Sequence, residues 1–391
     1  MTSNLQPETL DVERVVLERY GKGARQREES LCCPVDYDPR YLEVIPSEVL
    51  ERDYGCGDPS RFVREGDTVL DLGSGGGKIC FIASQIVGPR GRVIGVDMNE
   101  EMLALARKAA PDVARRIGYP NVTFHRGSIQ DLKLDLDLLD EWLRAHPVLA
   151  ASDLPALKEA ARLLRQERPL VPDASVDLVV SNCVLNLVRE ADKPRLLAEI
   201  YRVLEPGGRI AISDIVSDEE IPEDLKRDPE LWSGCISGAF QERELLSGLE
   251  SAGFYGIAIE QWAEEPFRVV SGIEFRSVTF TARKGKEGPC FEGNQAVIYR
   301  GSWKQVEDDD HHVLRRGERT AVCDKTYRIL ASPPYTADII PVPPRVAVPD
   351  PERSPFDCSR TAPRHPRESK GEGYTETTEG DAACCPPGSC R

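Results

Sequence analysis

Apolar segments of strand length alternate with amphipathic segments of helix length through most of the chain. The first apolar run, Thr68–Leu72, leads into a glycine-rich stretch, an apolar helix over Lys78–Val87 and a second strand over Arg92–Asp97. This order predicts parallel strands joined by helical crossovers. The pattern continues through NVTFH (121–125), SVDLVVSN (175–182), RIAISD (209–214), YGIAIEQW (255–262) and FRSVTFTAR (275–283). We therefore expect an α/β, Rossmann-like domain with a seven-stranded, mostly parallel sheet and an antiparallel last strand.

The segments around this pattern predict three further regions. Residues 1–60 hold an amphipathic helix and a polar connection, and they precede the α/β domain of residues 61–284. Within that domain, an Asp- and Leu-rich stretch before Pro169 is longer than a simple crossover and indicates a helical insertion. Residues 285–350 contain short strand candidates and predict a small α+β appendage. Residues 351–391 are polar and proline-rich, which predicts a disordered tail.

Composition and charge narrow the range of partners. The chain has 391 residues and a formal net charge of −16, which repels phosphate backbones and anionic lipid headgroups. It has no apolar run of the ~18 residues that a membrane span needs, and its N-terminus lacks a secretory signal pattern. We therefore expect a cytoplasmic monomer that binds neither nucleic acid nor membrane. Its 12 cysteines would be thiols there, which favours metal binding or thiol chemistry.

The glycine-rich stretch after the first strand predicts the cofactor. Asp71 is followed by three alternating glycines, Gly73, Gly75 and Gly77. A dinucleotide-binding loop would place its third glycine at the position of Lys78. The observed spacing instead suits S-adenosylmethionine, because a carboxylate at Asp71 can hold its ammonium group and the glycines allow the backbone to approach closely.

Residues at the ends of later strands extend this prediction. Asp97 ends the second strand, where a carboxylate can accept bonds from both ribose hydroxyls. Met98 and Ile129 could then enclose the adenine. Ser128 follows the third strand, and Asn182 ends the fourth. Both positions lie at the ligand-binding edge of the sheet, although serine and asparagine are also common loop-capping residues. The predicted cofactor-binding residues are Asp71, Gly73, Ser74, Gly75, Gly77, Asp97, Met98, Ser128, Ile129 and Asn182.

Cysteines occupy the positions where a methyl acceptor should lie. Methyl transfer needs a nucleophile about 3 Å from the methyl group and, for most acceptors, a base. None of the five histidines follows the fourth strand, and that position holds Cys183. Cys235 lies in LWSGCISGA after the fifth strand, and Cys56 lies in the turn-prone YGCGDP before the sheet. All three thiols could therefore reach the methyl group of the cofactor.

These motifs together resemble those of the arsenite methyltransferases. The resemblance rests on YGCG, DLGSGGG with VDM, SNCVLNLV, LWSGCISGA and a terminal cysteine group. It implies a class I methyltransferase that forms mono- and dimethylated arsenicals, with glutathione or thioredoxin as reductant. The implied arsenic ligands are the thiolates of Cys56, Cys183 and Cys235, with Cys32 or Cys33 as redox partner.

Arsenic chemistry accounts for the missing base. Trivalent arsenic is a soft centre with a lone pair, so three thiolates can hold it with that lone pair toward the sulfonium methyl group. No proton has to be removed at the moment of attack. Methyl transfer formally oxidises arsenic, and a thiol pair can return two electrons by forming a disulfide. The expected substrate is arsenite or its thiol complex.

The remaining cysteines have different expected roles. Cys80, on the apolar face of the helix after the glycine loop, is expected to be a core residue. Cys290 and Cys323, with the pair His311–His312, lack a C-x-x-C knuckle, so we expect no zinc site there. The cysteines of the polar tail either capture arsenic, which we favour, or are incidental exposed thiols. They are Cys384, Cys385 and Cys390.

Two other functions stay open at this point. A class I methyltransferase could act on a small organic acceptor, and its activity would then need no arsenic and would tolerate the loss of Cys235. A metalloid-binding buffer or sensor with a vestigial cofactor fold would bind arsenite but not S-adenosylmethionine. The intact set of Asp71, the three glycines and Asp97 argues against such decay.

Overall fold

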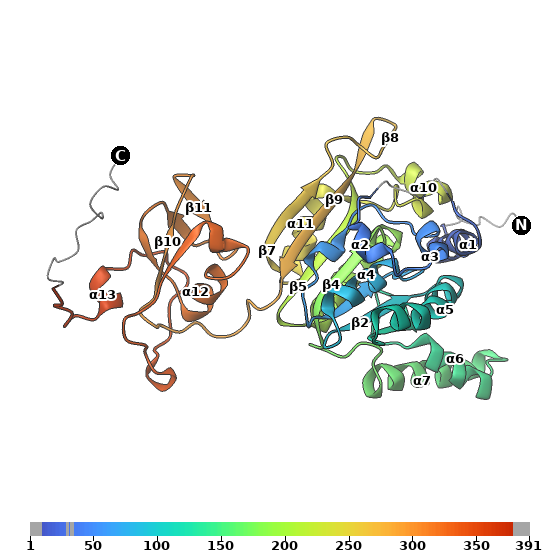
Figure 1. Ribbon diagram of the computed structural model, residues 1–391, viewed down its shortest axis with the longest axis horizontal. Coiled ribbons are helices and arrows are strands. Elements are labelled where there is room, and N and C mark those ends of the chain that lie inside the picture. The colour runs from blue at the N-terminus through green and yellow to red at the C-terminus, as the bar shows by residue number, and fades with distance from the viewer. Residues whose placement is uncertain (1–9, 29–30, 32–34, 378–391) are drawn as a thin grey trace, which may run out of the picture. The chain divides into compact units, whose positions relative to one another are not determined.

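The computed structural model describes residues 10–28, 31 and 35–377 (Figure 1). Contacts divide the chain into two compact units, one ending at Gly285 and the other beginning at Lys286. This division falls close to the boundary expected from the sequence. In the described part of the chain, no helix is both long and apolar enough to cross a bilayer.

The first unit is built on a mixed sheet. Its strands are β1 Thr68–Leu72, β2 Arg92–Asp97, β3 Val122–Arg126, β4 Val176–Asn182, β5 Leu204–Ser217, β6 Phe240–Gln241, β7 Tyr255–Trp262, β8 Arg268–Val270 and β9 Ile273–Arg283. The order is β3-β2-β1-β4-β5-β9-β7, with β1 to β5 parallel and β9 antiparallel to both neighbours. The predicted Rossmann-like α/β fold is confirmed. Two short strands, β6 beside β5 and β8 beside β9, extend the predicted seven strands to nine.

Helices pack on both faces of this sheet. They are α1 Val12–Arg25, α2 Pro39–Leu42, α3 Ser47–Glu51, α4 Lys78–Val87, α5 Glu100–Ile117, α6 Leu136–Ala145, α7 Leu154–Glu167, α8 Lys193–Val203, α9 Glu223–Lys226, α10 Pro229–Ser233 and α11 Glu242–Ser251. Side chains of successive residues in β1 point to opposite faces. Leu70 and Leu72 therefore pack into the core that α8 and α11 complete, whereas Val69 packs into the core beneath α4 and α5. Helices α6 and α7 form the predicted insertion and contact each other (Figure 1).

The N-terminal segment is part of the first unit rather than a separate region. Helix α1 contacts α5 and α10, and Val12 and Val16 form an apolar cluster with Trp232. The Arg19 guanidinium donates to the Ser233 hydroxyl (3.0 Å) at the end of α10. These contacts fix α1 beside the loop that carries Cys235.

The second unit has its own small core. Its elements are β10 Ala296–Tyr299, β11 Gln305–Glu307, β12 Val313–Arg315, β13 Arg319–Ala321, α12 Asp324–Leu330, β14 Ile339–Val342 and α13 Pro366–Lys370. Strands β13, β10 and β14 form an antiparallel sheet, and β11 pairs with β12. Val297, Val322 and Leu330 are central to the apolar cluster between the three-stranded sheet and α12. This is the α+β appendage expected from the sequence.

The prediction of a disordered tail from residue 351 is wrong for residues 351–377. The buried Arg364 pairs with Glu292 and Glu368, so its charge is satisfied inside the unit. Its backbone N–H also donates to the carbonyl of Arg319 in β13 (2.7 Å). The polar, proline-rich composition predicted disorder. Composition alone does not reveal that these polar groups form ion pairs and hydrogen bonds with other residues of the unit. Residues 378–391 lie outside the described part of the chain.

Candidate active site

A pocket opens at the carboxyl ends of the central strands. This is the edge where open α/β sheets bind ligands. Its lining includes eight of the ten residues predicted to bind the cofactor: Asp71, Gly73, Ser74, Gly75, Asp97, Met98, Ile129 and Asn182. The other two, Gly77 and Ser128, are not part of the lining. Tyr20, Asp53 and Met102 also line the pocket, although the sequence did not predict them as site residues.

The glycine loop follows β1 in a conformation that side chains rarely adopt. Gly73 and Gly75 have φ of +69° and +51°, and a Cβ at Gly73 would clash with Val184. The loop therefore brings its backbone to the pocket wall. Gly77 has φ of +91° and caps α4, where a Cβ would meet the Phe124 ring. Gly77 therefore allows close packing at the start of α4, and its cofactor contact stays a prediction.

Asp97 connects the glycine loop to the next helix. One carboxylate oxygen accepts the backbone N–H of Gly75 (2.8 Å) and the other accepts that of Asn99 (2.7 Å). Burial raises its pKa, and these backbone bonds oppose that shift. Each oxygen still has acceptor capacity for a ribose hydroxyl. The Ser74 hydroxyl, buried beside this loop, has no hydrogen-bond partner among the described residues, so a polar ligand would fit there.

Asp71 lies deeper, at the end of β1. Its carboxylate accepts a bond from the Cys80 thiol (3.1 Å), and burial raises its pKa to about 7. A bound ammonium group would lower that pKa and keep the carboxylate charged. Cys80 is fully buried, as expected of a core residue.

Apolar side chains form the part of the pocket suited to an adenine. Met98 and Ile129 both line it, together with Met102 from α5. Ser128, between β3 and the insertion, instead forms an isolated bridge with Asp131. This bridge is typical of a turn residue, and the cofactor contact of Ser128 stays a prediction.

Asn182 holds the Cys56 loop in place. Its side-chain oxygen accepts the backbone N–H groups of Cys56 (2.9 Å) and Gly57 (3.1 Å). Its nitrogen donates to the Gly57 carbonyl (2.7 Å) and the Tyr37 hydroxyl (3.1 Å). Both polar atoms of the amide are thus already engaged, and a Cβ at Gly55 would clash with them. Although Asn182 borders the pocket, its contacts are those of a positioning residue.

Replacing Asn182 with alanine is expected to weaken arsenite binding by about tenfold or more, because the Cys56 loop loses its support. It should also lower the free energy of unfolding by about 2–4 kcal/mol, since four buried bonds are lost. Arsenite titration and denaturant unfolding would measure both effects. The control is Asn121→Ala, which removes another amide bonded to Ser84 and Gly88. Unchanged arsenite affinity with weakened cofactor binding would instead make Asn182 a cofactor contact.

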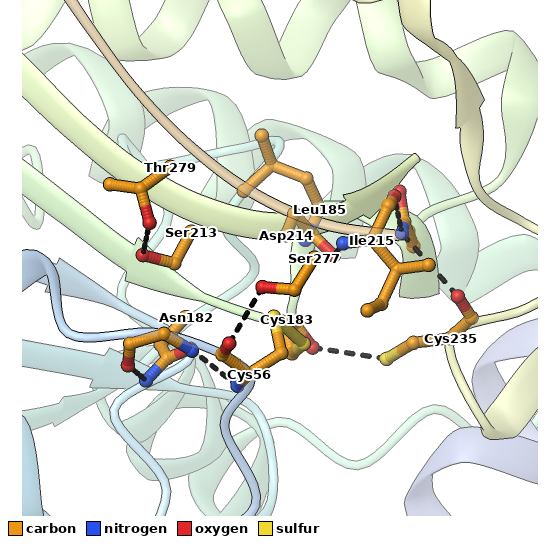
Figure 2. Close-up of a disulfide and its surroundings, with 12 residues drawn as sticks. Cys56, Asn182, Cys183, Leu185, Ser213, Asp214, Ile215, Cys235, Ser277 and Thr279 are labelled. Atoms are coloured by element: carbon orange, nitrogen blue, oxygen red, sulfur yellow. Dashed lines mark hydrogen bonds between the residues drawn. A yellow bond between two sulfur atoms is a disulfide. The ribbon is translucent and has the colours of Figure 1, made fainter. Parts of the chain in front are cut away.

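The three predicted acceptor cysteines come together beside the pocket (Figure 2). Cys56 and Cys183 form a disulfide, with Cα atoms 5.9 Å apart. The Cys235 thiol donates to the Cys183 carbonyl (3.1 Å), and all three side chains are buried. Cys183 lines the pocket. The structure thus holds two of the three expected thiolates in an oxidised form.

Unusual backbone geometry places two of these thiols. Cys183 and Cys235 have φ of +59° and +60°, a region that residues other than glycine adopt at a cost of about 1–3 kcal/mol. Backbone bonds hold both: the N–H of Cys183 donates to the Ser213 carbonyl (2.8 Å), and that of Cys235 to the Trp232 carbonyl (3.0 Å). Such conformations are common at functional sites.

Two residues near the thiols were not predicted from the sequence. Asp214 of β5 has a carboxylate oxygen within 4.8 Å of the sulfurs of Cys56 and Cys183, and burial raises its pKa to about 7. The Tyr20 hydroxyl of α1 lies 3.8 Å from the Cys235 sulfur. An acidic residue inside the apolar run RIAISDIV was a signal for Asp214. Nothing local in the N-terminal helix indicated Tyr20.

The other predicted arsenic and redox thiols lie outside the described residues. These are Cys32 and Cys33 near the N-terminus and Cys384, Cys385 and Cys390 in the tail. Their assignment stays a prediction.

Each of the two units matches a known protein family. A family model described as a methyltransferase domain matches residues 64–171 and 160–253, and one described as a domain of unknown function matches residues 286–374. A crystal structure of an arsenic(III) S-adenosylmethionine methyltransferase from Chlamydomonas reinhardtii matches with a TM-score of 0.55. It is 28% identical, and the match covers 83% of this chain and 100% of that one.

Curated sequences give matches of similar coverage at higher identity. The arsenite methyltransferase of Aquipseudomonas alcaligenes is 32% identical over 332 residues, which cover 80% of this chain and 85% of the relative. That of Mus musculus is 30% identical over 361 residues, which cover 84% and 85%. With these relatives, the methyltransferase-type sheet and the three cysteines at its edge, the chain belongs to the arsenite methyltransferase family.

Proposed function

We propose that this protein transfers methyl groups from S-adenosylmethionine to trivalent arsenic held by three cysteine thiolates. The observation that carries this proposal is the convergence of Cys56, Cys183 and Cys235 beside a pocket that also contains the glycine loop and Asp97. Purified protein given arsenite, S-adenosylmethionine and a thiol reductant should form mono- and dimethylated arsenicals, measured by mass spectrometry. Methylation of an organic acceptor without arsenic would contradict the proposal.

The thiols bind the substrate by exchange. Arsenous acid, As(OH)₃, reacts with three cysteine thiols to give As(S-Cys)₃ and three molecules of water, so no net charge enters the buried site. Sulfur is the ligand that this soft centre prefers. Asp214, close to two of the sulfurs, can take up a thiol proton during the exchange, since burial brings its pKa to about 7.

The pocket residues hold the methyl donor. Asp97 would accept the ribose hydroxyls, Asp71 would face the ammonium group, and Met98 and Ile129 would enclose the adenine. When bound there, S-adenosylmethionine supplies an electrophilic methyl group to the arsenic lone pair. Because Cys183 lines the pocket, its thiolate would hold arsenic on the side facing the donor.

A thiol pair completes the redox cycle. Addition of a methyl cation makes arsenic pentavalent, and two thiolates return it to the trivalent state by forming one disulfide and releasing two electrons to arsenic. The Cys56–Cys183 disulfide supports this proposal, because it places two thiols of the site within bonding distance. Cys32 or Cys33 is the proposed further partner. Glutathione or thioredoxin would then reduce the disulfide.

The oxidised protein is expected to bind S-adenosylmethionine but not arsenite, because the disulfide removes two of the three arsenic ligands. Reduction should restore binding of one arsenite per chain. Arsenic quantification after desalting, with and without a dithiol reductant, would measure this. All samples should carry serine at Cys358, Cys384, Cys385 and Cys390, so that neither the tail thiols nor a complete set of Cys290, Cys323 and Cys358 thiols can hold arsenite. Full arsenite binding without reductant would contradict the proposed ligand set.

The chemistry also suggests where the protein works. Thiolate ligands and a disulfide that must be reduced in each cycle require a reducing compartment, and we place the enzyme in the cytoplasm as a monomer. The cysteines of the tail are proposed to capture arsenite for the site. Arsenic detoxification is the corresponding cellular role.

A further inference from the structure

A second cluster of thiols lies in the second unit, apart from the proposed arsenic site. Its members are Cys290, Cys323 and Cys358, which come from three separate segments of the chain. Their sulfurs all lie within 4.8 Å of one another, and none forms a disulfide. In a tetrahedral zinc site with Zn–S distances of about 2.3 Å, sulfurs are about 3.8 Å apart. The three thiols are therefore close enough to share one ion.

Thr326 holds the Cys323 sulfur in place. Its backbone N–H donates to this sulfur (3.3 Å), and its hydroxyl oxygen lies 3.2 Å from the same atom. The buried Cys323 sulfur is thus positioned beside the sulfurs of Cys290 and Cys358.

A buried histidine lies in the same unit. His312 is only 2% exposed, and its Nδ1 bonds to the Asp308 carboxylate (2.9 Å). Its backbone N–H also donates to the Asp308 carboxylate (2.9 Å), which fixes His312 beside Asp308. Its Nε2 is buried with no hydrogen-bond partner among the described residues. A carboxylate on one nitrogen and a free second nitrogen are typical of a histidine that binds zinc.

We propose that Cys290, Cys323 and Cys358 bind a single Zn²⁺ ion in the second unit, with Nε2 of His312 moving in as the fourth ligand, because His312 does not belong to the group of ligand atoms within 4.8 Å of one another. Zinc accepts this mixed sulfur and nitrogen set and usually takes four ligands in a structural site. Trivalent arsenic would use the three sulfurs and leave His312 unused. The ion would join the segment around Cys358, predicted as disordered, to the core of the unit.

The site was not predicted because its ligands are spread along the sequence. Cys290 and Cys323 do not belong to a C-x-x-C motif, so their spacing did not indicate a zinc site. Cys358 lay in the segment assigned to the tail. Folding brings Cys358 back, since the Phe356 N–H donates to the Cys290 carbonyl (2.9 Å).

Zinc analysis of the full-length protein tests this inference independently of methylation. The background should carry serine at Cys32, Cys33, Cys56, Cys183, Cys235 and the three tail cysteines, to remove other candidate thiols. After exposure to zinc and desalting, this protein should retain one zinc per chain. Cys323→Ser or Cys358→Ser should lose it, and Asp308→Ala should weaken binding by about 10–100-fold. A background protein that binds no zinc, or a Cys323→Ser variant that retains it, would overturn the proposal.

Adjacent histidines provide a matched control. The His311 side chain is 88% exposed and pairs with Glu307, so His311→Ala should leave zinc affinity unchanged whereas His312→Ala should reduce it. Cobalt(II) should give the absorption of a tetrahedral thiolate site and be displaced by one equivalent of zinc, which needs no mutation that could impair folding. Binding of arsenite to these thiols without any binding of zinc or cobalt would also reject the zinc assignment.

Discussion

Serine in place of Cys183 is expected to lower arsenite methylation by more than about 100-fold, because the nucleophile loses the ligand that faces the donor. Cys183 lines the cofactor pocket, and its carbonyl accepts the Cys235 thiol (3.1 Å). A serine hydroxyl fits in the same space but is a poor ligand for soft arsenic. The remaining two thiols could hold arsenic only loosely and without a defined direction for its lone pair.

Cys235→Ser should give a loss of the same order, since it also leaves two thiolates. Cys56→Ser should be milder, because another thiol can complete the set. The measurements are arsenic products by mass spectrometry, arsenite bound per chain, and the Kd of S-adenosylmethionine, which should stay within about twofold of wild type. Cys80→Ser is a matched control for arsenite binding, because Cys80 bonds to Asp71 and lies outside the thiol group.

Full turnover by the Cys183→Ser variant would reject the three-thiolate mechanism. A loss of S-adenosylmethionine binding equal to the loss of activity would also reject it, because Cys183 would then act through the cofactor. If the protein instead methylates a small organic acceptor, the Cys235→Ser variant should keep its methyltransferase activity. The two cysteine variants therefore separate these functions in one experiment.

The repeating part of the fold could be predicted from the sequence. The structure gives α4 and β2 the bounds that were expected, Lys78–Val87 and Arg92–Asp97, because glycines and a Gly-Pro turn limit both apolar runs. Cys183 and Cys235 follow β4 and β5, so topology brings them to the same edge of the sheet. Cys56 reaches this edge through the bonds of its loop to Asn182. Local pattern and global fold agree in this region.

Features that depend on distant partners could not be predicted. Asn182 ends β4 as expected, but its bonds to the Cys56 loop arise only when residues far apart in sequence meet. Gly77 and Ser128 fit a binding motif by position, but the space taken by Phe124 beside Gly77 and the bridge from Ser128 to Asp131 could not be read from that motif. A motif gives the type of residue at a position, and the tertiary contacts decide which atoms remain free for a ligand.

Asp97→Ala is expected to raise the Kd of S-adenosylmethionine by about 100-fold, equivalent to about 3 kcal/mol. The carboxylate accepts the N–H groups of Gly75 and Asn99, and a bond to a charged acceptor contributes about 1.5–3 kcal/mol. The change therefore releases the glycine loop as well as removing the proposed ribose contacts. Isothermal titration would measure it, with Asp112→Ala, an exposed carboxylate of α5 paired with Arg115, as the control.

Arsenite binding by the reduced Asp97→Ala protein should remain at one per chain, because the thiol group rests on Asn182, Ser213 and Trp232 rather than on the glycine loop. Cys183→Ser should show the reverse, with the cofactor bound and arsenite lost. One variant should lose S-adenosylmethionine binding and the other arsenite binding. This result is expected only if separate sets of residues, which meet at Cys183, hold the methyl donor and the arsenic. Loss of both ligands in the Asp97→Ala protein, with its fold intact by circular dichroism, would mean that the two sets do not act independently.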